Sequence, residues 1–274
     1  MKVEFFYYLV FCTSSWIVSS EKLEFTALNV ALLEPNGVKI LQKLEKHLWS
    51  AINNLGEIIR VNASMSDEIP MKKVLDCSPQ LLDQSFRIRL AREETIKIDF
   101  EDGKIGLENG KFNFLLILGQ DFEKCKVDDT LLATASPCYI EGSNRPLLGL
   151  LNICPGQRRW KKFSMITDLF RHEILHSLGF GMIKEKNENK LNDESGLFLD
   201  FDKRATDFMI KSFDCDGLAG ILSDDERKTH LDQKIFKTEL MTAVLSNRRN
   251  FFTNISAMIL EDTHLNDGLF EPIK

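Results

Sequence analysis

The segment that most constrains the fold of this chain is residues 164–179, where apolar residues recur at helical spacing and two histidines stand four positions apart. Residues i and i+4 of a helix lie on one face, so His172 and His176 can direct their imidazoles at one metal ion. Gly179 is a typical helix stop and places both histidines in the last turns. The fold must therefore bury this helix and bring both rings to a common point. Its apolar face consists of Met165, Ile166, Leu169, Phe170, Ile174 and Leu175.

The carboxylate next to the first histidine gives this helix a second possible role. Glu173 lies one position round the helix from His172, so it can reach a metal-bound water without being a ligand itself. This is the His-Glu-x-x-His arrangement of zinc proteases. The alternative is a pair of core histidines that hydrogen-bond to nearby carbonyls, because the five-residue pattern also arises by chance.

A third ligand decides between these readings, since a catalytic zinc has three protein ligands and one open position. Among metzincins the third histidine usually follows six residues after the second, but Met182 stands there, and its thioether is a poor zinc ligand. Glu194 is one candidate for a glutamate ligand. His230 and His264 are the others, because His47 belongs to an earlier predicted helix. Spacing alone leaves the choice open.

The composition is that of a soluble globular protein, with 274 residues, 43% of them hydrophobic and 28% charged. This length suits one large domain or two lobes with a shared core. The net charge of −6, with no dense block of Lys or Arg, predicts no nucleic-acid partner. The pairs Arg158-Arg159 and Lys161-Lys162 are interpreted as solvated loop surface.

The first twenty residues predict a secretory signal peptide. Lys2 precedes an apolar stretch, and small residues follow at positions 18–20, so cleavage is expected before Glu21. A membrane anchor is the competing interpretation, but the apolar run is short and residues 13–15 interrupt it. No later segment is apolar enough to span a bilayer. We therefore expect a secreted, extracellular protein with no transmembrane segment in the mature chain.

The cysteines outside the signal peptide are odd in number, so at least one is left over if the others pair. In an oxidising compartment disulfides are the default. Cys138 and Cys154 lie near the ends of two predicted strands and are the first predicted pair. Cys77 with Cys125 is the possible second pair, which leaves Cys215 over.

Two tripeptides match the acceptor pattern for N-linked glycans. They begin at Asn62 and Asn254. A secreted chain can carry glycans at these positions, so both are predicted glycosylation sites.

Hydrophobic periodicity predicts a strand–helix–strand opening, then several strands, then helices. A polar loop is expected over 184–194. The first half should form a mixed sheet with one or two helices beside the histidine helix, which makes the fold α+β. The predicted strands are 26–33, 57–64, 95–100, 111–119, 131–140 and 147–154, and the further predicted helices are 38–55, about 202–213 and 254–261.

The surroundings of His230 resemble one family of zinc enzymes. Met241 and Thr242 follow this histidine within the sequence "ELMT", and several further segments occur in the family's order. Between Leu131 and Thr263 the chain resembles the leishmanolysin family of metzincin metalloproteases, in which a long insertion precedes the third histidine. The segments that carry the resemblance are "ATASPCYIEGSNRPLLGLLNICP", "RHEILHSLGF", "DFMIKSFDCDGL", "ELMT" and "FTNISAMILEDT".

The resemblance implies a metzincin-like catalytic domain with one Zn²⁺ ion held by His172, His176 and His230. Glu173 would act as catalytic general base and acid, and Met241 would form a structural methionine turn. The expected organisation is a signal peptide over 1–20, an N-terminal lobe with the active-site helix over 21–182, and a mostly helical or irregular C-terminal lobe over 183–274.

The implied function is a secreted zinc metalloendopeptidase that acts on protein or peptide substrates; the oligomeric state is left open. We expect a shortened or divergent member, because no propeptide cysteine is recognisable before the first strand and the chain stops at Lys274 without a cysteine-rich region. Two alternatives stand beside this function. One is a zinc hydrolase with Glu194 as third ligand, and the other is a non-catalytic secreted binding protein that keeps the metzincin fold.

Overall fold

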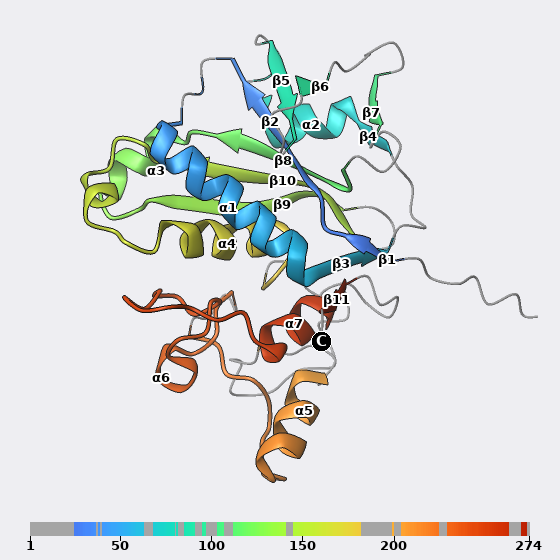
Figure 1. The fold of residues 1–274 in the computed structure, drawn as a ribbon, viewed down its shortest axis with the longest axis vertical. Helices are drawn as coiled ribbons and strands as arrows, with labels where there is room; N and C mark the ends of the chain where they lie inside the picture. Colours follow the sequence, from blue (N-terminus) through green and yellow to red (C-terminus); the bar gives the residue numbers. More distant parts are fainter. Residues whose placement is uncertain are drawn as a thin grey trace, which may run out of the picture.

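A computed structural model of the chain provides the coordinates, and its described residues fall into two regions (Figure 1). The sheet region covers the described residues between 25 and 181, and the C-terminal region covers those between 199 and 272. The structure describes residues 25–36, 38, 40–62, 68–79, 81, 85–90, 95–96, 103–106, 112–140, 145–181, 199, 204–224, 229–262 and 270–272.

The sheet region is built on a mixed six-stranded sheet with strand order β6-β5-β2-β8-β10-β9. Its three central strands β2, β8 and β10 run parallel, while β5, β6 and β9 are antiparallel to their neighbours. The mixed sheet and the α+β fold class predicted from the sequence are thus confirmed. The strand bounds are β2 Val30–Pro35, β5 Phe86–Arg89, β6 Thr95–Ile96, β8 Phe114–Gly119, β9 Ala133–Ile140 and β10 Pro146–Ile153.

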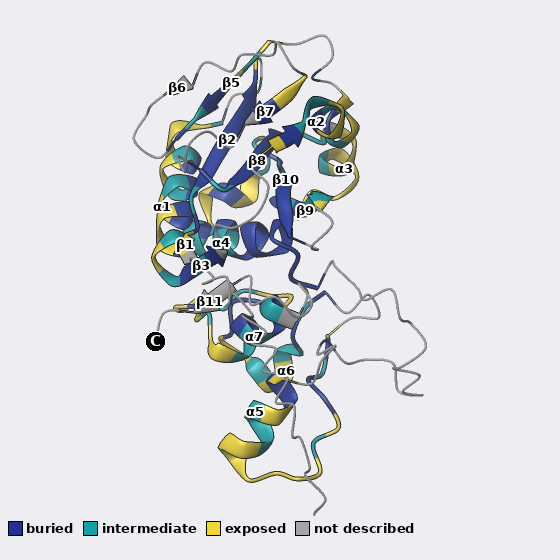
Figure 2. Cartoon of the chain, turned by 90° about the vertical axis from the view of Figure 1, so that its right-hand side faces the viewer, coloured by how far each residue is buried: buried dark blue, intermediate teal, exposed yellow. Residues whose placement is uncertain are grey.

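Both faces of the central strands are buried, which is why these strands read as continuous apolar runs (Figure 2). Alternate residues point to opposite faces, so Val30 and Leu32 join one core cluster while Ala31 and Leu33 join the other. The helices α1 (Gln42–Ile58) and α4 (Ile166–Ser177) pack into the first cluster, and α2 (Met71–Cys77) packs into the second. The first cluster continues into the C-terminal region through residues such as Met241.

Helix α4 approaches the sheet closely at one glycine. A methyl group on Gly149 of β10 would lie 2.7 Å from the Cβ of Ser177 and 2.8 Å from the Cζ of Phe114. Only a residue without a side chain fits there, so Gly149 allows α4 to pack this closely against β10. The helix ends at Ser177, and Gly179 follows with φ of 109°. The predicted helix stop is confirmed.

Two smaller sheets complete the strand pairing. In the first, β3 (Ile59–Asn62) lies between β1 (Phe25–Ala27) and β11 (Phe270–Pro272). Because β11 comes from the C-terminal region, this sheet joins the two regions. In the second, β4 (Glu68–Pro70) pairs with β7 (Lys104–Gly106).

The C-terminal region contains short helices joined by irregular segments. Helices α5 (Arg204–Phe213) and α7 (Asn254–Asp262) match the predicted helices closely. Sequence periodicity missed α6 (Gln233–Phe236), which is a single turn capped by the Asp232 carboxylate. It also missed three short helices of the sheet region, namely α2, α3 (Phe122–Val127) and the 3-10 helix η3 (Arg158–Lys161).

The predicted disulfide pairs are wrong. Cys77 bonds to Cys138, and Cys125 bonds to Cys154, with Cα atoms 5.5 Å apart in each pair. The reason is the register of the β9–β10 pair. Cys154 follows the end of β10, and its backbone N–H donates to the carbonyl of Leu132, just before the start of β9. Cys138 lies near the opposite end of β9, so the antiparallel register keeps it away from Cys154.

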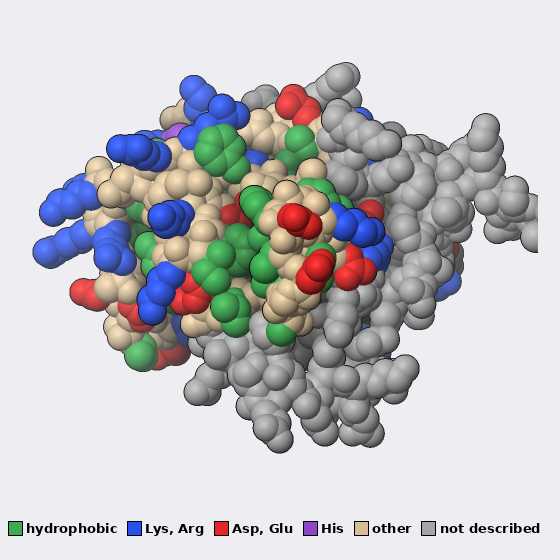
Figure 3. Space-filling model, turned by 90° about the horizontal axis from the view of Figure 1, so that it is seen from below, with side chains coloured by type: hydrophobic (Ala, Val, Ile, Leu, Met, Phe, Trp, Pro, Cys, Tyr) green, Lys and Arg blue, Asp and Glu red, His purple; other side chains and the backbone are tan. Residues whose placement is uncertain are grey.

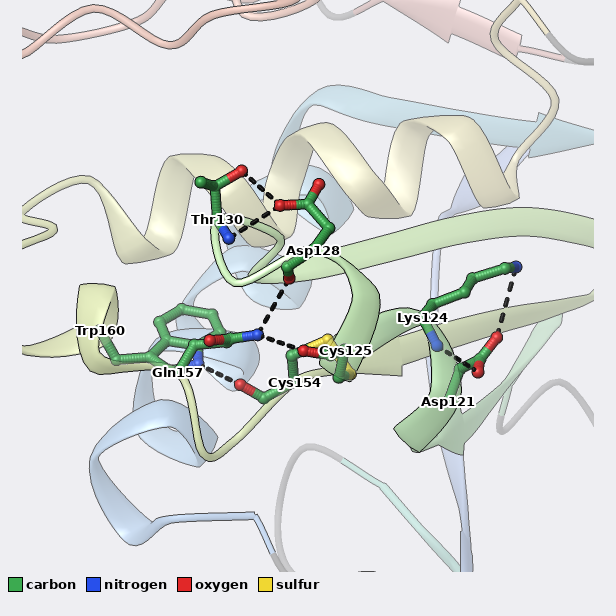
Figure 4. The surroundings of a disulfide bond; sticks show 8 residues. All are labelled: Asp121, Lys124, Cys125, Asp128, Thr130, Cys154, Gln157 and Trp160. Atoms are coloured by element: carbon green, nitrogen blue, oxygen red, sulfur yellow. Dashed lines mark hydrogen bonds and ion pairs between the residues drawn. A yellow bond between two sulfur atoms is a disulfide. The ribbon is translucent and has the colours of Figure 1, made fainter.

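The bond between Cys125 and Cys154 lies in a small polar cluster (Figure 4). The indole N–H of Trp160 donates to the carbonyl of Cys154 at 2.7 Å, and the amide group of Gln157 donates to the carbonyl of Cys125 at 2.7 Å. These bonds attach α3 and η3 to the end of β10. Cys215 is unbonded and exposed, as the odd cysteine count predicted.

Several remaining predictions concern the chain's surface and its beginning. The predicted signal peptide lies outside the described residues. No helix of the described part is long and apolar enough to cross a bilayer. Of the two sequon asparagines, Asn62 ends β3 and Asn254 is exposed at the start of α7.

Candidate metal centre

Three histidine side chains from the two regions meet at one point. His172 and His176 come from α4, and His230 comes from the segment before α6. The Nε2 atom of His176 lies 3.0 Å from that of His172 and 3.1 Å from that of His230. One ligand atom from each ring lies within 4.8 Å of the others. The structure thus brings together the three histidines selected from the sequence.

The outer nitrogens of the two helix histidines contact backbone carbonyls. Nδ1 of His172 donates to the carbonyl of Leu240 at 2.8 Å, and Nδ1 of His176 donates to the carbonyl of Phe180 at 2.9 Å. A carbonyl only accepts hydrogen bonds, so Nδ1 carries the proton in both rings. Each Nε2 therefore presents its lone pair toward the common point.

His230 is held by its neighbours in an irregular segment. The hydroxyl of Ser223 donates to its carbonyl at 2.9 Å, and its Nδ1 lies 3.0 Å from the hydroxyl oxygen of Thr229. The next amide, that of Leu231, donates to the carbonyl of Met241 at 2.9 Å. Hydrogen bonds to backbone thus place the third ring opposite the two rings of α4.

This donor set fits a zinc ion. In the neutral tautomers fixed by the carbonyls, lone pairs of His172 and His176 face each other at 3.0 Å, which is repulsive unless a cation lies near both. Burial, together with His176, lowers the pKa of His172 to about 3, so this ring is neutral at physiological pH. Neutral imidazole is the form that binds metal, and three imidazoles suit zinc and other late transition metals.

Glu173 lies on the buried side of α4, next to the edge strand β9. Its side chain is 8% exposed and hydrogen-bonds to the backbone of Ala135 in that strand. Burial raises the pKa of this carboxyl to about 8. A positive charge at the three histidines would oppose this effect and favour the carboxylate. Such tuning toward neutral pH is typical of a general acid and base.

The segment predicted as a methionine turn is fully buried and bonded on two sides. Met241 and Leu240 are both 0% exposed. The backbone N–H of Leu240 donates to the carbonyl oxygen of Phe251 at 2.8 Å, and the backbone N–H of Phe251 donates to the carbonyl oxygen of Thr238 at 2.9 Å. The same segment supplies the Leu240 carbonyl to His172 and the Met241 carbonyl to Leu231. It therefore links the helix histidines to the third one.

Sequence reasoning missed the groups that orient the rings. The carbonyls of Leu240 and Phe180 belong to the backbone, which leaves no side-chain signature. The glycine at position 179, with its positive φ, was the available signal that the chain turns back after α4 and brings the Phe180 carbonyl to His176. The buried amide of Asn250 was also missed; it bonds to Asp168 in the first turn of α4 at 3.1 Å.

The other positions considered for a third ligand are Glu194, Met182 and His264, and all three lie outside the described residues. His47 is on α1, where its Nδ1 lies 2.7 Å from the hydroxyl oxygen of Thr167.

A mixed sheet, a His-Glu-x-x-His helix and a distant third histidine beside a buried segment at Leu240 and Met241 are consistent with a metzincin-like fold. The family comparison agrees with this class. The leishmanolysin family model (Peptidase M8) matches residues 122–270, which is more than half of the chain. The chain therefore belongs to the leishmanolysin family.

A curated relative supports the same assignment. The chain is similar to the "Ciliated left-right organizer metallopeptidase" of Xenopus laevis, with 23% identity over 208 residues. The match covers 67% of this chain and 29% of that protein, so the chain matches less than a third of the relative's length.

Proposed function

We propose that this chain is a zinc-dependent endopeptidase, with His172, His176 and His230 holding one zinc ion and Glu173 serving as general base and acid. The observation that carries the proposal is the convergence of three Nε2 atoms, with the rings of His172 and His176 held from the other side by backbone carbonyls. A structural pair of core histidines would gain nothing from a third ring at 3.1 Å.

The zinc ion, Glu173 and two backbone carbonyls would have separate roles in hydrolysis. Zinc, when bound, supplies a Lewis acid that polarises the scissile carbonyl and lowers the pKa of water. Glu173 accepts the proton of the attacking water and then delivers it to the departing amine. The Leu240 and Phe180 carbonyls hold the imidazoles in the tautomer and orientation that the reaction needs.

The position of the edge strand supports a peptide as substrate. Strand β9 ends the strand order of the six-stranded sheet, and Glu173 contacts it at Ala135. An extended peptide can add to a sheet edge through main-chain hydrogen bonds, which recognise a peptide independently of its sequence. Substrate bound in this way would lie near the proposed general base.

The proposal is tested by metal content and casein hydrolysis, with and without a chelator. Glu173→Gln should keep a full zinc equivalent and lose activity by at least about 100-fold. Asp207→Asn, an acid-to-amide change on α5, is the matched control and should keep both zinc and activity. Absence of zinc from folded, metal-supplied protein would remove the enzyme function, as would unimpaired hydrolysis by Glu173→Gln.

The alternative zinc hydrolase is separated by two alanine variants. His230→Ala should lose zinc, whereas Glu194→Ala should retain it. The reverse result would favour Glu194 as the third ligand. A folded zinc-loaded protein without any peptidase activity would instead favour a non-catalytic binding protein.

We also propose the organisation expected from the sequence: a signal peptide over 1–20, lobes over 21–182 and 183–274, secretion, and glycans at Asn62 and Asn254. Two disulfide bonds support an oxidising compartment. The exposed position of Asn254 supports its modification. Mass spectrometry of protein secreted from eukaryotic cells, before and after enzymatic deglycosylation, tests both the cleavage site and the glycans.

A further inference from the structure

The structure places eight exposed cations on one surface although the chain has a net charge of −6. We call this surface the basic patch. Within the segments 155–165 and 233–255 the only acidic residue is Glu239, and it is buried. From outside these segments, exposed Asp128 lies beside Arg159 at the edge of this surface. The members of the basic patch are Arg158, Arg159, Lys161, Lys162, Lys234, Lys237, Arg248 and Arg249.

Hydrogen bonds bring the three parts of the basic patch together. Asn250 bonds to Asp168 in the first turn of α4, six residues after Lys162, which is the last cation of the segment 158–162. The Phe251 amide donates to the carbonyl of Thr238, the residue after Lys237, which directly follows α6. Figure 3, which views this end of the molecule, shows Lys and Arg side chains gathered on one side of the face. The patch is therefore continuous across two regions of the sequence.

Apolar side chains are exposed beside these cations. Among the described residues seven large hydrophobic side chains are exposed, and three of them lie within residues 235–251. Val244 is 64% exposed, Ile235 is 53% exposed and Phe251 is 48% exposed. The guanidinium of Arg249 lies 5.4 Å from the ring centroid of Phe251. In Figure 3 hydrophobic side chains lie next to the gathered cations.

We propose that the basic patch docks the protein on a membrane that carries anionic lipid headgroups. Cations alone would also fit a sulfated polysaccharide, but exposed apolar side chains between cations gain free energy when they leave water for lipid hydrocarbon, which a polysaccharide does not offer. Each Lys or Arg near an anionic bilayer contributes about fivefold to the partition coefficient. The interaction does not depend on the zinc site, since no proposed ligand belongs to the patch.

Co-sedimentation with lipid vesicles tests the proposal. The full chain should bind vesicles of phosphatidylcholine with roughly 30% phosphatidylserine, and should bind far less to vesicles of phosphatidylcholine alone. Raising NaCl from about 0.1 M to about 0.5 M should weaken binding, because the Debye length falls severalfold.

Two variants and one control locate the surface. The quadruple change Lys161→Gln, Lys162→Gln, Arg248→Gln and Arg249→Gln should reduce the partition coefficient by at least about 20-fold. Val244→Ser should reduce it by about threefold, because it removes an apolar contact without changing charge. The matched control changes four exposed lysines elsewhere, namely Lys43, Lys46, Lys72 and Lys126, to Gln.

The outcomes are distinguishable from those of the peptidase assay. Hydrolysis of a soluble peptide should be equal in the wild type, the quadruple variant and the control, which also verifies folding. Equal binding to neutral and anionic vesicles would overturn the proposal, as would an equal loss in the control. Retention on immobilised heparin without vesicle binding would overturn it as well and would assign the patch to a sulfated polysaccharide.

Discussion

The two regions of the molecule position their histidines by different physical means. The sheet region holds His172 and His176 on a helix that packs into a large apolar core over a six-stranded sheet. The C-terminal region holds His230 in an irregular segment through hydrogen bonds to Ser223, Thr229 and the methionine turn. Removing apolar contacts should therefore unfold the first region, whereas removing single hydrogen bonds should loosen the metal site in the second.

The largest effect is expected from the core beneath α4. Phe170 is 0% exposed, so Phe170→Ala should lower the free energy of unfolding by about 3–5 kcal/mol. Phe213→Ala, at a side chain that is 67% exposed, is the control and should change it by less than about 0.5 kcal/mol. Denaturant unfolding measures both. Similar losses of unfolding free energy in the two variants would contradict the claim that the apolar core of the sheet region stabilises the fold most.

A smaller loss is expected where α4 meets β10. Gly149→Ala puts a methyl group 2.7 Å from the Cβ of Ser177, so the helix must shift, at a cost of about 1–3 kcal/mol in unfolding free energy. Gly156→Ala is the matched control, because a methyl group there meets nothing within 4 Å. Thermal and denaturant unfolding compare the two. An unchanged unfolding free energy for Gly149→Ala would show that the close approach of α4 to β10 at Gly149 does not determine the position of the helix.

The bond between the regions should affect both the metal site and the stability of the fold. Asn250→Ala removes the amide that joins the methionine-turn segment to Asp168, and should lower zinc affinity by about tenfold or more through the Leu240–His172 contact. The cost in unfolding free energy should be about 1–3 kcal/mol. Asn247→Ala, at an exposed position in the same loop, should change neither quantity. Competition with a fluorescent zinc chelator measures the affinity, and an unaltered value for Asn250→Ala would disprove the link.

The smallest effect is a pH dependence in the C-terminal region. Burial raises the pKa of Glu239 above its ordinary value of 4.5, against the opposing hydrogen bonds from Ser256 and Thr253. The folded chain then keeps a proton that the unfolded chain releases, so the free energy of unfolding falls as pH rises from about 4.5 toward the folded-state pKa. Glu239→Gln has no such titration. Melting temperatures of the metal-free proteins should therefore diverge in favour of the variant as the pH rises above about 4.5, and parallel curves would refute the effect.

Periodicity was sufficient where an element is long or buried on both faces. Strands β8 and β10 and helix α4 were predicted because their apolar patterns follow directly from burial in a sheet or on a helix face. The pattern of α5 and α7 was equally readable. By contrast, α6 and β11 are only a few residues long, and their conformation depends on contacts with distant segments.

The same contrast holds for the candidate site. His172 and His176 followed from local spacing on one helix, while spacing left Glu194 and His264 as rivals of His230 until the family resemblance was considered. The disulfide prediction failed because it used strand ends without the antiparallel register that separates Cys138 from Cys154. The carbonyl groups that orient the histidine rings, such as that of Leu240, could not be predicted, because every residue has a carbonyl and the sequence does not distinguish one from another.

The pairing of β3 with β11 has a consequence for biosynthesis. Ile59 pairs with Pro272, so this ladder closes only after the ribosome has added more than 200 further residues (272 − 59). A nascent chain that has emerged only as far as α4 holds two of the three proposed ligands and lacks the third. Any hydrolytic capacity would thus arise only after the segment with His230, far along the chain, has left the ribosomal exit tunnel.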